Sequence, residues 1–287
     1  MPNMKNIKTK LDSVSTMKQL FNSMELSDFE KLKRTEKQVD SYKSFMEDFF
    51  WILWSANVDL FKSVENILST KKLILVFSTD KWFCWNYNNK LFKNIYNEYC
   101  DDKANVDVFC VWKKSFEFFA KKWFNIVWYL KLSDDFGLKD LSEIYDYFVS
   151  SISNNLYWDV SVYLNLYRNK INSKTVNYNV YPLQEDSLNM FVNNFWIKIA
   201  KFSEWVSLWV ESDQFRLEME KQLLQYMLYW AALQNKIAEL KSRISAIQNM
   251  KNTSEFVVKD LKLSFNRLCQ SLLTREVSSI MELKTAY

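Results

Sequence analysis

The apolar residues of this chain recur at three- and four-residue steps over most of its length, a spacing that places them on one face of a helix. In residues 212–250 the steps alternate between four and three, which keeps one seam turned toward a partner helix. At a rise of about 1.5 Å per residue, a single helix over this stretch is roughly 58 Å long. We expect the seam to pair either with another helix of this chain, most simply residues 255–273, or with a second subunit. The seam consists of Met219, Leu223, Tyr226, Trp230, Leu233, Ile237, Leu240, Ile244 and Ile247.

The same spacing predicts helices in most of the remaining chain. Residues 1–25 are expected to form a loosely held arm, because their apolar positions are scattered among lysines. Ser27 and Glu30 have the spacing of a capping box, which predicts a helix start there. Further helices are predicted for residues 90–99, 108–131 and 138–167, for the segment that begins at Pro182, and, after a restart near 252–255, for the C-terminal end.

Two short segments do not follow the helical period. Residues 73–77 are either a short strand or a buried helical turn, and 175–181 alternate like an extended connector. The 287 residues include one glycine and two prolines, so the tight turns of β-hairpins and phosphate-binding loops are nearly absent. We therefore predict an all-α fold, an elongated helical bundle with long C-terminal coiled-coil-like helices. Its expected domains are an N-terminal helical region, 1–180, and a C-terminal long-helix region, 181–287.

Composition removes several classes of function. The chain has no histidine, which excludes Ser-His-Asp and Cys-His catalysis within it and removes a common metal ligand. Its cysteines, Cys84, Cys100, Cys110 and Cys269, show no C-x-x-C spacing and are expected to be reduced thiols. We predict no catalytic residue, no metal site and no cofactor. A net charge of +4, interspersed with acids, argues against a nucleic-acid surface.

No membrane span or secretory signal is predicted. The longest apolar runs, such as residues 49–54, are far shorter than the roughly 18 residues that cross a bilayer. The N-terminal residues alternate polar and lysine positions and form no apolar signal core. The expected protein is soluble or peripheral, and cytoplasmic.

Aromatic residues are unusually frequent, with 12 Trp, 15 Tyr and 22 Phe. They form either a thick helical core or an exposed patch for a partner. Those near the junction of the two long C-terminal helices cannot all face one buried stripe, so some are expected to face outward. Exposed Trp and Tyr often anchor interfaces, although they can also cap the bundle's own core. The predicted partner-binding residues are Trp196, Trp205, Trp209, Phe215, Tyr226 and Trp230.

The order of features from Pro182 onward resembles the C-terminal region of the E subunit of class III polyhydroxyalkanoate synthases. The resemblance covers roughly residues 138–287. Two candidate segments stand near that family's junction before its final helix, and both lack its proline. The matching features are the Pro182-Leu183 entry, Leu188 and Phe191 before Trp196, the turn at 212–215, the long helix that follows, and the junction candidates 253–255 and 274–277.

The resemblance implies a non-catalytic accessory subunit that binds and activates a polyhydroxyalkanoate synthase. The family's catalytic cysteine, histidine and aspartate belong to the other subunit, so none of the four cysteines is assigned a catalytic role. The implied location is cytoplasmic or granule-associated, and self-association is a further expectation. The alternatives are a helical scaffold or interaction protein, or a peripheral amphipathic protein that coats a membrane or granule. For the last, residues 108–131 supply a basic amphipathic segment.

Overall fold

The computed structural model describes residues 4–55, 69–167, 173–183, 185–195, 197 and 213–285. The chain forms two compact units, one of Met1–Glu30 with Arg243–Tyr287 and one of Lys31–Ser242. Helices α1 (Met4–Ser55) and α6 (Asp213–Thr285) each contribute to both units. The domain boundary expected between residues 180 and 181 falls inside a strand of the larger unit. The division of the chain into functional regions 1–180 and 181–287 stays a prediction.

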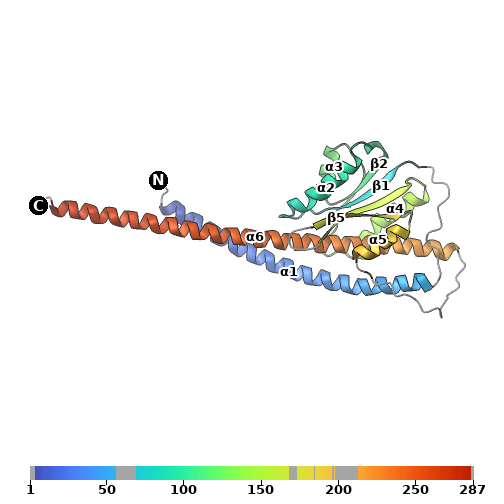
Figure 1. The fold of residues 1–287 in the computed structure, drawn as a ribbon, viewed down its shortest axis with the longest axis horizontal. Coiled ribbons are helices and arrows are strands. Elements are labelled where there is room, and N and C mark those ends of the chain that lie inside the picture. Colours follow the sequence, from blue (N-terminus) through green and yellow to red (C-terminus); the bar gives the residue numbers. More distant parts are fainter. Residues whose placement is uncertain are drawn as a thin grey trace. The chain divides into compact units, whose positions relative to one another are not determined.

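The larger unit contains a five-stranded sheet with the order β3-β2-β1-β4-β5 (Figure 1). The pairs β1–β2, β2–β3 and β1–β4 are parallel, and β5 is antiparallel to β4. Parallel neighbours need a crossover connection, which helices provide here. The strands are β1 (Lys72–Phe77), β2 (Val106–Val111), β3 (Asn125–Leu130), β4 (Asp159–Tyr167) and β5 (Ser173–Tyr181).

Helices cover both faces of this sheet. Alternate residues of a strand point to opposite faces, and in β1 and β2 both sets are buried. Leu73 and Leu75 of β1 face a core formed with α1, α4, α5 and α6, whereas Ile74 faces a core formed with α2 and α3 (Figure 1). The connecting elements are α2 (Trp85–Tyr99), the 3-10 turn η1 (Lys103–Asn105), α3 (Lys113–Lys121), the 3-10 turn η2 (Leu138–Leu141), α4 (Ser142–Ser153) and α5 (Glu185–Phe195).

The prediction of an all-α fold is wrong, because the larger unit is a mixed α/β structure. Scarce glycine disfavours hairpin turns, but parallel strands joined through helices do not need them. Strands buried on both faces also lack the alternation that marks a half-exposed strand. The predicted helix 108–131 is β2, α3 and β3, and the predicted helix 138–167 is η2, α4 and β4. Residues 73–77, left open between strand and helical turn, lie in β1.

Both long helices, α1 and α6, extend further than the sequence predicted. Residues 4–25 belong to α1 rather than to a loose arm, and α6 runs through 252–255 without a break. The seam of α6 pairs within the chain, which is one of the two expected alternatives, but its partner in the larger unit is α1 rather than residues 255–273. Tyr42 of α1 stacks on Trp230 with ring centroids 5.8 Å apart, and Glu36 pairs with Lys241 at 2.9 Å.

In the smaller unit, polar pairs join α1 to α6. Arg243 contacts the buried Asp28 at 3.2 Å, and Glu25 accepts hydrogen bonds from Lys251 and Gln248. The hydrogen bonds from Lys251 and then Gln248 lower the pKa of Glu25, which stays ionised. The two helix segments of this unit are therefore held by charged contacts in addition to apolar ones.

Candidate functional site

Of the six predicted partner-binding residues, the structure brings two together in an aromatic cluster between α1 and α6. Tyr226 meets the rings of Phe45 and Phe49 edge-on, each with a centroid distance of 4.9 Å. Trp230 is 1% exposed and stacks on Tyr42, which also contacts Tyr226. Such edge-to-face contacts stabilise a core beyond the apolar area that they bury. In this structure both residues thus join α6 to α1.

The other four predicted residues are not part of this cluster. Phe215 is half-buried near the start of α6. Trp196, Trp205 and Trp209 lie outside the described residues. Partner binding by the six stays a prediction.

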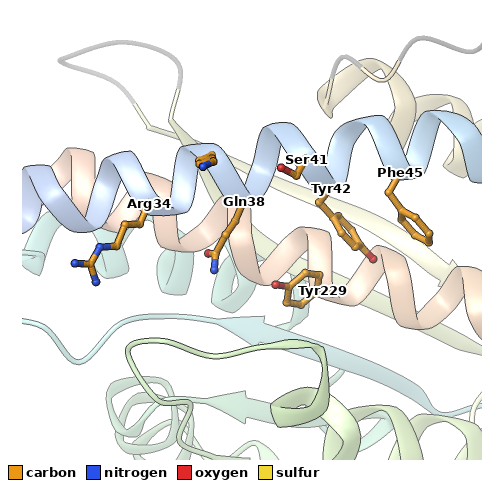
Figure 2. Close-up of a pocket in the computed structure, with 7 residues that line it drawn as sticks. Arg34, Gln38, Ser41, Tyr42, Phe45 and Tyr229 are labelled. Atoms are coloured by element: carbon orange, nitrogen blue, oxygen red, sulfur yellow. The ribbon is translucent and has the colours of Figure 1, made fainter.

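An open hollow of about 520 Å³ lies on the surface of α1 beside α6. Figure 2 labels Arg34, Gln38, Ser41, Tyr42 and Phe45 along α1, with Tyr229 contributed by α6. Arg34 and Lys37 are the charged side chains that line it. Burial raises the pKa of Tyr42, so this phenol stays neutral and can donate a hydrogen bond. The lining residues are Arg34, Lys37, Gln38, Ser41, Tyr42, Phe45 and Tyr229.

Three lysines from distant parts of the larger unit converge on Asp134, which precedes η2. Its carboxylate lies 2.6 Å from Lys81 Nζ, 3.2 Å from Lys31 Nζ and 3.5 Å from Lys236 Nζ. Burial alone would raise the pKa of Asp134, but hydrogen bonds from Lys81 and Lys31 and the charge of Lys236 hold it well below its usual range. We name these four residues the Asp134 cluster. It connects α1, the loop after β1 and α6 through one carboxylate.

The carboxyl end of β1 is also fastened to α6. The hydroxyl of Tyr87 donates to Asn235 Oδ1 at 2.6 Å, and the Asn235 amide donates to the Ser78 carbonyl at 3.2 Å. All three residues are buried. Hydrogen bonds between buried polar groups specify one geometry, because breaking them leaves unsatisfied groups. The sheet and α6 of this unit therefore share a fixed polar joint.

The place where many parallel α/β sheets bind phosphate is filled by a side chain here. Ligands of such sheets gather at the carboxyl ends of the strands, often on the amide groups that open a helix. At the start of α3, Asp80 accepts the N–H groups of Lys113 at 3.0 Å and Lys114 at 2.8 Å. A carboxylate thus occupies the position that a phosphate needs. This helix start is not available for a nucleotide.

The described residues also offer no metal centre, and burial holds one of the four thiols protonated. They contain no group of three or more possible metal ligands. The Cys110 thiol is buried, which raises its pKa to about 12 and keeps it protonated. The described helices include none that could cross a membrane. The contacts described above join the sheet of the larger unit to α1 and α6.

Sequence reasoning missed the Asp134 cluster, although one signal was present. Lys236 and Glu239 are charged residues beside the apolar seam of α6 and are both buried, with Lys236 Nζ 3.4 Å from Glu239. Buried charges need partners, so two charges beside the seam indicate that a polar contact covers them. The partner Asp134 could not be named from spacing, because it lies about a hundred residues away from both Lys31 and Lys236.

A family model and the most similar relatives point to the same protein family. A family model described as ATP synthase matches residues 3–282. The ATP synthase gamma chain of Limosilactobacillus reuteri is 23% identical over 96% of this chain and 95% of the relative. The ATP synthase gamma chain of Campylobacter jejuni is 25% identical over 98% of both chains.

Solved structures share the fold. A chain from the Euglena gracilis mitochondrial ATP synthase, OSCP/F1/c-ring, aligns with a TM-score of 0.69 and 14% identity, covering 99% of this chain and 94% of that one. A chain from the Tetrahymena thermophila ATP synthase central stalk and c-ring aligns with a TM-score of 0.57, 14% identity, and 80% and 98% coverage.

These findings overturn the resemblance to the E subunit of polyhydroxyalkanoate synthases. The predicted activation of such a synthase, the synthase partner and the granule association are wrong, because a different family model covers nearly the whole chain. The resemblance rested on the order of amphipathic helices after Pro182, a pattern that unrelated proteins share. It also took no account of the sheet that precedes those helices.

Proposed function

The chain belongs to the ATP synthase family, and from this premise we propose that it is the gamma chain, a non-catalytic rotor component of the central stalk. The observation that carries the proposal is the continuous match over residues 3–282, which includes α1, the sheet and α6. Catalysis is then supplied by other subunits, which agrees with a chain that has no histidine. The proposed partners are the alpha, beta and epsilon subunits and the c-ring.

The larger unit has the contacts that torque transmission needs. A rotor must pass force between its helices and its globular part without slipping. The Asp134 cluster and the joint formed by Asn235, Tyr87 and Ser78 both fasten α6 to the loop after β1. Because these contacts are polar and directional, they resist sliding better than apolar contacts of the same area. They support a role in mechanical coupling.

The smaller unit has apolar surface available for partners. Beyond Glu255, α6 exposes Phe256, Leu273, Met281 and other large apolar side chains. Exposed apolar surface of this extent marks interaction sites. We propose that alpha and beta subunits cover it in the assembled enzyme. The chain is then a peripheral subunit of a membrane-bound complex, and in a bacterial cell this position faces the cytoplasm.

Co-assembly tests the proposal. The full chain is produced together with the alpha and beta chains encoded in the same genome, and the complex is purified through a tag on the beta chain. We expect this chain to copurify in substoichiometric amount relative to alpha and beta, and ATP hydrolysis to depend on it. A bead attached to the sheet is expected to rotate during hydrolysis. Failure to copurify, with folding of the chain verified by circular dichroism, contradicts the proposal.

A further inference from the structure

The strand β3 has one edge that no described strand covers. It lies at the end of the sheet order and pairs with β2 only. The Trp112 N–H donates to the Leu130 carbonyl at 2.8 Å, so the backbone groups of Leu130 face β2. Backbone groups of neighbouring residues in a strand face opposite sides, so those of Tyr129 face away from β2. The outer edge therefore offers donors and acceptors that pair with no described strand.

Large aromatic side chains surround this edge. The exposed fractions are 48% for Trp128, 39% for Tyr129, 41% for Phe116 and 87% for Trp123. The rings of Phe116 and Tyr129 lie 5.6 Å apart, so they form one surface on the α3 side. Aromatic residues are enriched at the centres of protein interfaces, and here they lie beside the outward backbone groups of the strand.

The α3 side of the edge is positively charged. Lys113, Lys121, Lys122 and Lys131 are exposed, and Glu117 is the one acidic residue between positions 113 and 131. Glu117 pairs with Lys113 at 3.4 Å and Lys122 Nζ lies over the Tyr96 ring of α2, which leaves Lys121 and Lys131 in excess. On the other face of the sheet, α4 carries the acidic Glu143 and Asp146. Exposed lysines therefore outnumber exposed acidic residues on the side that Phe116 and Tyr129 occupy.

We propose that the outer edge of β3, with Phe116, Tyr129, Lys113, Lys121 and Lys131, binds an extended acidic segment of another protein by strand addition. An added strand pairs with the outward backbone groups of Tyr129, while its side chains reach the aromatic surface. Acidic residues on that strand complement the excess lysines. We call this surface the β3 edge. The inference goes beyond the proposed function and does not depend on which complex the chain joins.

The charges argue against two other occupants. A second copy of this chain that paired through β3 would bring together two surfaces with the same excess of lysines, and like charges that face each other across an interface are unfavourable. A layer of anionic lipid would satisfy the lysines but would not supply the regular donors and acceptors that pair with a strand edge. An acidic extended segment satisfies both the backbone and the charge.

Site-directed crosslinking in the assembled complex tests the β3 edge. The photoreactive residue p-benzoylphenylalanine replaces Trp128 in the full chain, and the crosslinked peptide is identified by mass spectrometry. A control places the same residue at Trp158, which is 44% exposed and lies outside β3. We expect position 128 to capture a segment of another protein with net negative charge, and position 158 not to capture it. Crosslinks from position 128 only to another copy of this chain, only to lipid, or to nothing overturn the proposal.

Two variants of Tyr129, each combined with the photoreactive residue at position 128, then distinguish strand addition from non-specific binding. Tyr129→Pro removes the outward N–H but keeps the ladder to β2, whereas Tyr129→Phe keeps both. We expect the proline variant to reduce the crosslink yield at least tenfold and the phenylalanine variant to leave it within twofold. Equal yields from both variants, with thermal unfolding unchanged, contradict pairing through the backbone.

Charge reversal tests the complementarity. The triple variant Lys113→Glu, Lys121→Glu, Lys131→Glu is expected to lower the crosslink yield at least tenfold. The matched control is Lys174→Glu, an exposed lysine on β5, the strand at the opposite end of the sheet order. The wild-type yield is also expected to fall as salt rises from 0.05 to 0.5 M, because exposed charges are screened. A yield that is insensitive to both changes overturns the acidic partner.

Discussion

Two segments of the same helix, α6, differ in what covers them. In residues 223–240 nearly every side chain is buried, because α1 packs on one side and the sheet core on another. Beyond Glu255 the same helix exposes large apolar residues, such as Phe256 and Leu273. We call these the covered segment, 223–240, and the uncovered segment, 256–281. Helical spacing marks an apolar face in both, but only the fold shows which face has a partner within the chain.

The difference indicates two sources of helix stability. The covered segment gains stability from burial of its own apolar surface, at about 25 cal/mol per Å² removed from water. The uncovered segment has less of this contribution, and most helical stability in proteins comes from such packing. In the proposed function, the missing contacts come from neighbouring subunits. The two segments should therefore respond in opposite ways to substitution, in the isolated chain and in the complex.

The largest expected effect comes from a charge in the covered segment. Leu233 is 1% exposed, so Leu233→Asp buries an unpaired carboxylate and is expected to cost at least about 4 kcal/mol of the free energy of unfolding. The matched variant Leu273→Asp changes the same residue type where it is 60% exposed, and its cost is expected within about 0.5 kcal/mol. Urea denaturation of the isolated chain measures both. Similar costs for the two variants would remove the distinction between the segments.

Truncation of an aromatic ring gives the next largest effect. Trp230→Ala leaves a cavity beside Tyr42 and is expected to cost about 3–5 kcal/mol. Phe256→Ala, at a position that is 72% exposed, is expected to change the isolated chain by less than about 0.5 kcal/mol. In the complex with alpha and beta chains, Phe256→Ala is expected to have a larger effect than in the isolated chain, since it then removes an intersubunit contact. Unchanged co-assembly of the Phe256→Ala variant would argue against that contact.

The sequence predicted some of these features and not others, for physical reasons. A long helix from about residue 212 and its apolar seam were recognisable, because period and length are local properties. The strands were not, since β1 and β2 are buried on both faces and are too short to distinguish from helical turns by period. Trp230 and Tyr226 were singled out for size, but whether they are covered depends on α1, more than 180 residues earlier in the chain.

Loss of the central carboxylate in the Asp134 cluster is expected to have a moderate effect. Asp134→Asn removes the anionic partner that Lys31, Lys81 and Lys236 share and leaves Lys236 with Glu239, which we expect to cost about 1–3 kcal/mol. The control Glu117→Gln breaks an exposed pair with Lys113 and is expected to cost less than about 1 kcal/mol. Equal costs would show that the cluster does not hold the covered segment more firmly than a surface ion pair.

The pH dependence of the same variant gives a second readout. The pKa of Asp134 is lowered in the folded chain, so its contribution is present above the unfolded value of about 4 and is lost as pH falls through the folded value. The stability difference between wild type and Asp134→Asn is therefore expected to stay constant from pH 7 to about pH 4.5 and to shrink below about pH 4. Urea denaturation at a series of pH values measures it. A difference that is constant down to pH 2.5 would mean that the carboxylate charge is not what matters.

The smallest expected effect concerns the last polar contact before the uncovered segment. Lys18 Nζ lies 2.7 Å from Glu255 in the smaller unit, and its hydrogen bond lowers the pKa of that carboxyl. Both side chains are largely exposed, so water and salt screen the pair and side-chain entropy opposes it. We expect Glu255→Gln to leave the midpoint of thermal unfolding unchanged within error at 0.15 M salt. A measurable decrease, restored by charge exchange in the double variant Lys18→Glu, Glu255→Lys, would show that this contact secures α6 to α1. The limit of the firmly held part of α6 would then lie further toward the C-terminus than its burial indicates.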